Sequence, residues 1–306
     1  MNWYLSAAIF GAVLGMYQFG YNTGNINAPE KEIKQFIQEI YSTRYDATLS
    51  KESSKTYFSV IVSLFLVGGL IGSLSGGYVA DKFGRKRGLL YTQAFSIAGA
   101  ILMGCSKAAH SFEMLMIGRF FVGLSCGLFT GLSPLYVAEI SPIKIRGAMG
   151  TVNQLAVTSG ILTSMVLGLR KVLGGRDSWP TLLALTIVPS LLQCIILPFM
   201  PETPRYLILS KDNVDEGEKA LQKLRNIEDV QEEIDELQNE ESGETSTIES
   251  LSIWQLLTSS ELRLSLFVCI CLHLSQQLSG IVAIFYYSTS FFENGGIKGD
   301  DAQYGK

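Results

Sequence analysis

The sequence has few charged residues for its length. Of 306 residues, 17% are Asp, Glu, Lys or Arg and 47% are hydrophobic, and the mean hydropathy is +0.26. A typical soluble domain carries about 25% charged residues. The segment 201–261 holds 16 acidic and 5 basic residues, and the remainder holds 12 and 19. An apolar chain with one acidic insertion excludes a soluble enzyme, a DNA-binding domain and a disordered tail, and predicts a polytopic membrane protein that binds no nucleic acid.

Residues that hold metals or do covalent chemistry are also scarce. The chain has five cysteines, without zinc-type spacing, and two isolated histidines, His110 and His273. An odd cysteine count without CxxC pairs argues against a disulfide framework. The sequence shows no nucleophile–base pair, phosphate loop or dinucleotide fingerprint. We therefore expect no metal, no cofactor and no enzymatic activity. We read the first apolar stretch as a retained span, because Met1 leads into it without a basic region.

Seven apolar stretches are long enough to cross a bilayer, whose core needs about 20 residues per helix. They are approximately 5–25, 57–80, 89–107, 113–137, 148–169, 179–200 and 263–288. Unsatisfied backbone groups are costly in lipid, so each stretch is predicted to be helical. The expected organisation is a six-helix transmembrane bundle over 1–200, with a hydrophilic connection at 28–56. A linker follows over 201–262, with helical spacing at 214–225 and 227–238, and the seventh helix lies in 263–306.

Two connections combine glycine or proline with charge. GGYVADKFGRKRG (76–88) follows the second stretch, and we expect Gly77 and Gly84 to permit a tight turn between two helices. SPLYVAEISPIKIRG (133–147) joins the fourth and fifth stretches, and its Pro134 can break a helix. The acidic and basic residues of these two connections are typical of a charge latch, in which one pair of helices is held to another by ion pairs. The alternative is a simple basic stop-transfer loop. Counting Lys and Arg in the connections does not settle the orientation.

With GRF (118–120), these connections resemble the sugar porter family of the major facilitator superfamily. PETPRYL (201–207) and QQLSGIVAIFYYSTSFF (276–292) match two further motifs of that family. GYNTGNINAP (20–29) and the QLS triplet (277–279) are similar to the animal class I facilitative glucose transporters. The resemblance implies two six-helix bundles, termini in the cytoplasm, and location in the plasma membrane. It places 28–56 outside the cell and 201–262 inside.

The resemblance also implies the residues that contact the sugar. Gln154 matches a sugar contact of the first bundle, and Gln276 and Gln277 match contacts of the seventh span. Amides suit a sugar because each offers two donors and an acceptor without a charge to bury. Tyr286 and Tyr287 look like the family's outer gate.

Val282 stands where the family usually has a sugar-binding asparagine, so no sugar-binding role is assigned to it.

The charged motifs match the family's conserved loops on the cytoplasmic side. We expect a charge latch there, which closes the inner face and opens when the bundles rock. Its candidate members are Asp81, Arg85, Glu139, Arg146, Glu202 and Arg205.

Asn22 bears on the mechanism. Proton-coupled members of the family carry Asp at the matching place, where a carboxylate can bind the coupling proton. Asn cannot titrate, and the intramembrane Arg119 of the GRF motif is expected to brace helices. The sequence therefore favours passive uniport.

The resemblance leads to a facilitative transporter of hexose, with D-glucose favoured by the QLS triplet, working by alternating access. The family has twelve spans, whereas this sequence stops 18 residues past the seventh. The alternative is a truncated, non-transporting chain that associates with and regulates full-length relatives, or an incomplete gene product. The stretch GGIKGDDAQYGK (295–306) is what the family places before an eighth span.

Overall fold

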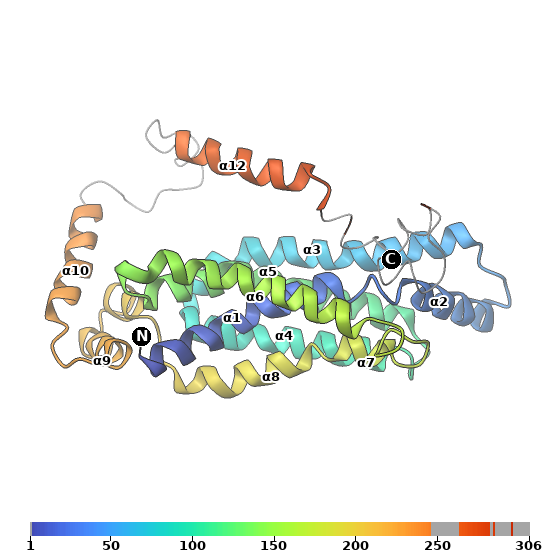
Figure 1. The fold of residues 1–306 in the computed structure, drawn as a ribbon, viewed down its shortest axis with the longest axis horizontal. Helices are drawn as coiled ribbons and strands as arrows, with labels where there is room; N and C mark the ends of the chain where they lie inside the picture. Colours follow the sequence, from blue (N-terminus) through green and yellow to red (C-terminus); the bar gives the residue numbers. More distant parts are fainter. Residues whose placement is uncertain (1, 246–262, 282–283, 285–294, 296–306) are drawn as a thin grey trace.

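The chain folds as a bundle of long helices that run side by side along the longest axis (Figure 1). A computed structural model describes residues 2–245, 263–281, 284 and 295. The helices are α1 (Trp3–Gly24), α2 (Glu30–Tyr45), α3 (Lys51–Phe83), α4 (Arg85–Cys105), α5 (Phe112–Ile140), α6 (Ile143–Leu167), α7 (Trp179–Ala184), α8 (Ile187–Ile196), α9 (Val214–Arg225), α10 (Gln231–Thr245) and α12 (Arg263–Leu278). Short 3₁₀ and π turns occupy Leu197–Phe199 and Tyr206–Ser210.

The predicted all-α fold is confirmed, since the described residues form helices and no strand. Within the part of the chain that the structure describes, four helical segments are long and apolar enough to cross a membrane: α3, α4, α5 and the segment Trp179–Phe199 that contains α7 and α8. The 33 residues of α3 correspond to about 50 Å at 1.5 Å per residue, more than a 30 Å hydrocarbon core needs. Helices α1 and α6 pack alongside these four (Figure 1). The total of seven spans stays a prediction.

Glycine sets how closely the helices approach. A Cβ added at Gly72 of α3 would lie 2.2 Å from the carbonyl oxygen of Leu124 in α5, and one at Gly123 would lie 2.2 Å from that of Phe65 in α3. The α1–α6 crossing is similar, because a Cβ at Gly20 would lie 2.0 Å from the Val157 carbonyl oxygen. Backbones therefore touch at these crossings, as small residues allow in membrane helices.

Helix α2 lies within the stretch expected only as a hydrophilic connection. Its buried residues Ile33, Phe36, Ile37 and Ile40 recur at helical spacing. Phe36 packs against the ring of Trp179 at the start of α7, with centroids 5.2 Å apart.

Ion pairs then fix α2 to the start of α5 and to the connection between α6 and α7. They join Arg44 to Glu113 at 2.6 Å, Arg170 to Glu32 at 2.9 Å, and Arg176 to Glu39 at 2.5 Å.

Two sequence expectations about helix breaks were wrong. Gly77 lies inside α3, and only Gly84, with φ of 87°, makes the turn into α4. Pro134 lies within α5, which continues to Ile140.

At the opposite end, α9 lies against the end of the bundle, beside the N-terminus (Figure 1). Asn213 caps it by accepting a hydrogen bond from the Glu216 backbone N–H, so the helix starts where the sequence predicts. Arg225 donates to the Ile140 carbonyl at the end of α5, at 2.8 Å. By contrast, α12 buries none of its residues.

Candidate functional site

A buried cluster of neutral polar side chains joins α1, α4 and α8 inside the bundle. Gln18 accepts hydrogen bonds from Ser96 at 2.7 Å and Ser190 at 2.9 Å, and it donates to Gln193 at 3.2 Å. Gln93 of α4 also donates to Gln193. All five side chains are 0–1% exposed. Buried polar groups are expensive unless they are paired, so this cluster specifies how the three helices meet.

Asn22 extends the cluster toward the α2 end of the bundle. Its amide nitrogen donates to the Gln18 carbonyl at 2.8 Å, and its side-chain oxygen accepts from Thr186 at 2.9 Å and from Asn25 at 3.2 Å. Asn22 is fully buried. The side chain therefore acts as donor and acceptor at once, as a neutral amide can and a carboxylate cannot.

Arg119 of α5 lies beside this cluster and is also fully buried. It donates to the Asn22 carbonyl at 3.0 Å and lies over the Phe65 ring, 4.4 Å from its centroid. One side chain thus contacts α1 and α3 together, the geometry of a helix brace.

The structure places the predicted sugar contacts on exposed faces. Gln154 of α6 is exposed, and so are Gln276 and Gln277 of α12. Among the described residues, no hydrogen bond joins α6 to α12, so these amides do not form a closed site. Tyr286, Tyr287 and Val282 lie outside the described residues.

The charged loops meet at the α9 end of the bundle. Arg85 opens α4 and donates through both Nε and a terminal nitrogen to one carboxylate oxygen of Glu139, at 3.2 and 2.9 Å. The two side chains are 11% and 8% exposed. The Arg85 guanidinium also lies over the Tyr206 ring, 5.3 Å from its centroid. An ion pair this buried is screened far less than a surface pair.

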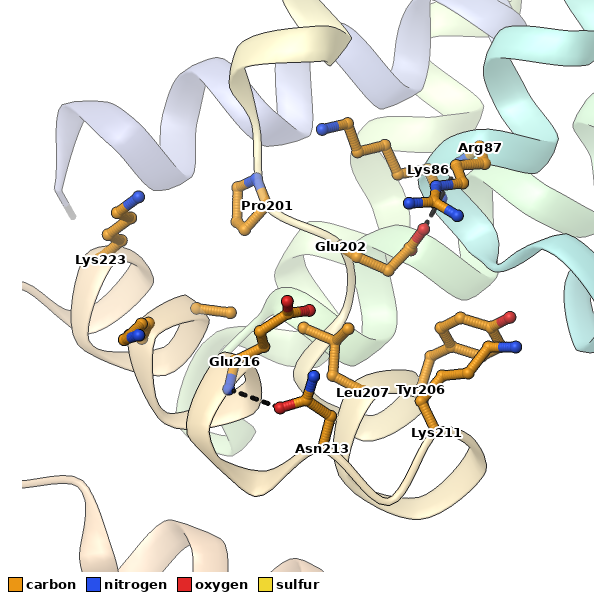
Figure 2. A pocket seen from close by; sticks show the side chains of 12 residues that line it. Lys86, Arg87, Pro201, Glu202, Tyr206, Leu207, Lys211, Asn213, Glu216 and Lys223 are labelled. Atoms are coloured by element: carbon orange, nitrogen blue, oxygen red, sulfur yellow. Dashed lines mark hydrogen bonds between the residues drawn. The ribbon is translucent and has the colours of Figure 1, made fainter.

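Glu202 binds the first turn of α4. Its carboxylate accepts from the backbone N–H groups of Lys86 at 2.8 Å and Arg87 at 3.4 Å, toward which it points in Figure 2. It also accepts from the backbone N–H of Thr203 at 3.1 Å. A helix N-terminus favours an anion at this position. Burial nevertheless raises the pKa of Glu202, and the backbone hydrogen bonds act in the opposite direction.

Two of the other latch candidates lie apart from this contact. Asp81 and Arg146 are exposed, and neither makes an ion pair within the described ranges. Arg205 is half-buried, directly before Tyr206. Of the six predicted residues, Arg85, Glu139 and Glu202 thus meet at this end of the bundle, and Asp81 and Arg146 do not join them.

Sequence reasoning missed the glutamines at 18, 93 and 193. The signal was present, because each is a polar residue inside an apolar stretch. It could not show that the three meet, since that depends on how α1, α4 and α8 pack.

Comparisons with known proteins agree with this fold. The family model for sugar (and other) transporters matches residues 7–305. The chain is 46% identical to facilitated glucose transporter member 1 of solute carrier family 2 from Gallus gallus, over 96% of this chain and 60% of that protein. It is also 46% identical to member 3 from the same organism, over 95% of this chain and 58% of that protein. The chain thus spans about 60% of the length of these relatives.

Solved structures of the xylose transporter XylE from E. coli show the same arrangement of helices. The partially occluded inward-open form matches with a TM-score of 0.79 at 22% identity, covering 98% of this chain and 68% of that one. The form bound to 6-bromo-6-deoxy-D-glucose matches with a TM-score of 0.82 at 23% identity, covering 98% and 65%. At this identity the match shows the fold, which is that of the major facilitator superfamily.

Proposed function

Because this chain belongs to the sugar transporter family, we propose that it is the N-terminal part of a facilitative hexose transporter with D-glucose as the substrate. The named activity of the relatives, facilitated glucose transport, supports the substrate class. Their greater length supports the need for further spans. The transporter would work by alternating access between two bundles in a lipid bilayer.

The observation that carries the uniport mechanism is the bonding of Asn22. Its nitrogen donates to the Gln18 carbonyl and its oxygen accepts from Thr186 and Asn25. The side chain therefore makes its hydrogen bonds without gaining or losing a proton. A coupling proton needs a group that gains and loses it during the cycle, and an amide does neither. Transport is therefore proposed to follow the sugar gradient alone.

The exposed amides support a sugar site between two halves. Gln154 on α6 and Gln276 and Gln277 on α12 are unburied in the described chain, so their donors and acceptors are available to a ligand. We assign them to the sugar, and Tyr286 and Tyr287 to the outer gate.

The latch is proposed to hold the inner face closed. Its centre is the Arg85–Glu139 pair, and Glu202 ties α4 to the segment after α8. We assign Arg205 to the latch as well, and Asp81 and Arg146 would join it only in another conformation.

Radiolabelled glucose uptake in a transporter-null host tests the function. The chain is compared with a clone whose reading frame continues past residue 306, at pH 5.5 and 7.5, with and without a protonophore. We expect the longer clone to take up glucose at rates that do not depend on the proton gradient. Loss of uptake when the gradient collapses would refute uniport, and no glucose uptake by the longer clone would refute the substrate.

A non-transporting, regulatory chain is the second candidate. It is favoured by α12, which buries none of its residues and thus offers an apolar helix to another chain. Co-expression with a full-length relative tests it. Reduced uptake together with co-purification supports this candidate, and unchanged uptake opposes it.

We also propose a plasma-membrane location with the N-terminus in the cytoplasm. A glycosylation sequon inserted at 46–50 should then be glycosylated, and one inserted at 226–230 should not. The reverse pattern would refute the orientation.

A further inference from the structure

A basic cavity lies between the start of α4, the segment after α8, and α9. Its volume is about 530 Å³, within the range of small-molecule sites. Figure 2 shows Lys86 and Arg87 on one side of the Pro201–Glu202 segment and Lys223 of α9 on the other. Because Leu197–Phe199 ends the preceding apolar segment, the cavity opens close to the membrane boundary.

The lining carries more positive than negative charge. It includes five basic residues, Lys86, Arg87, Lys211, Lys219 and Lys223, against two acidic ones, Glu202 and Glu216. Glu202 opposes a bound anion only weakly, because its carboxylate is already held by backbone N–H groups at the start of α4.

Three of the five basic side chains have no counter-ion in the described part of the chain. These are Arg87, Lys219 and Lys223, which are exposed and make no ion pair there. The other two have partners of a different kind, since Lys86 donates to the Pro198 carbonyl at 2.9 Å and Lys211 lies over the Tyr206 ring.

Lys219 and Lys223 are four residues apart on one face of α9, a spacing at which like charges destabilise a helix. An anion bound between them would remove this repulsion. A phosphomonoester carries nearly two negative charges at pH 7 and three acceptor oxygens, which suits three free cations better than a single carboxylate does.

We propose that this cavity binds a phosphomonoester anion, carried either on the headgroup of an inner-leaflet lipid or on a small soluble molecule. The site is distinct from the exposed amides assigned to the sugar, and its test does not depend on transport.

Isothermal titration of the chain in phosphatidylcholine nanodiscs tests the site. The probes are dioctanoyl phosphatidylinositol 4-phosphate, its deacylated form glycerophosphoinositol 4-phosphate, which keeps one diester and one monoester, and dioctanoyl phosphatidylinositol, which lacks the monoester. Equal affinity for the two monoester probes identifies a soluble ligand, and a much higher affinity for the acylated probe identifies a lipid. Either result supports the site, provided that phosphatidylinositol binds more weakly.

The double variant Lys219→Gln with Lys223→Gln should weaken binding about fivefold per lysine. Because both side chains are exposed, the fold should be kept, as size-exclusion chromatography will show. The matched control, Lys82→Gln with Lys144→Gln, removes two exposed charges outside the lining and should change affinity less than twofold. An equal loss in the control, equal binding of phosphatidylinositol, or no binding of either monoester would overturn the proposal.

Discussion

Replacing Asn22 by Asp tests the neutral cluster directly. The side chain is fully buried, and its nitrogen donates to the Gln18 carbonyl at 2.8 Å. The new carboxyl can keep that hydrogen bond only when it is protonated. When ionised, it turns a negative oxygen toward a carbonyl oxygen, inside a cluster whose other members are neutral amides and hydroxyls.

The two protonation states should differ in stability by a few kcal/mol. The protonated form loses at most one neutral hydrogen bond, about 0.5–1.5 kcal/mol. An uncompensated buried charge costs about 3–5 kcal/mol. Arg119 reduces this cost, since its guanidinium lies 3.0 Å from the Asn22 carbonyl. The net penalty of ionisation is therefore about 2–3 kcal/mol.

Thermal unfolding of the detergent-purified chain at pH 4 and pH 8, each compared with the parent chain at the same pH, measures the difference. A penalty of this size is lost only when the pH falls to the unfolded pKa of Asp, about 3.9, so Asn22→Asp should be close to the parent chain at pH 4 and unfold several degrees lower at pH 8. The control Asn239→Asp adds a carboxyl at an exposed position within α10 and should show no such change. Equal unfolding temperatures of Asn22→Asp at both pH values would show that Arg119 neutralises the carboxylate fully, and the reasoning would fail.

Three further outcomes are expected. Glu139→Gln in the longer clone should shift the transporter toward the inward-open state, because the amide lacks the charge that holds the buried ion pair with Arg85. The binding of inhibitors specific for one side of the membrane measures this shift. If that binding and the sugar flux are both unchanged, the latch is only a stop-transfer cluster. Gln277→Ala should weaken glucose binding several-fold, and more than Gln154→Ala, since a lost neutral hydrogen bond is worth about 0.5–1.5 kcal/mol; no change in either would refute the site. Gly123→Val should destabilise the purified chain by about 1–3 kcal/mol or more, because its Cβ would lie 2.2 Å from a backbone carbonyl of α3. A Cβ at Gly131 would meet nothing within 4 Å, so Gly131→Val should be tolerated, and equal melting temperatures of the two variants would contradict the close crossing.

The helices were predictable because their signal is long and local. A run of about 20 apolar residues identifies α3 or α5 regardless of what surrounds it. Helix α2 was missed because its charged residues dominate the composition, although its isoleucines at 33, 37 and 40 carry the periodicity. Pro134 misled for a physical reason, since neighbouring helices can satisfy the backbone of an interrupted helix in a bundle.

The charged contact was only partly predictable. The motif positions predict that Arg85, Glu139 and Glu202 lie at one end of the bundle. They do not predict that Glu202 binds backbone N–H groups, because that contact depends on the turn at Gly84. Arg146 shows that closeness in sequence does not place a residue in the contact. It follows Glu139 by seven residues, yet its position at the start of α6 leaves it exposed.

The packing also bears on where movement can occur. Backbones touch at the α3–α5 and α1–α6 crossings, and the buried amides tie α1 to α4 and α8. Sliding one helix past another would break these contacts and leave buried polar groups unpaired, at about 1–3 kcal/mol for each group. The exposed faces of α6 and α12 carry no such penalty. Under the proposed function, alternating access would therefore move this bundle as one body against the remaining spans, with the charged contacts at the α9 end separating as it does so.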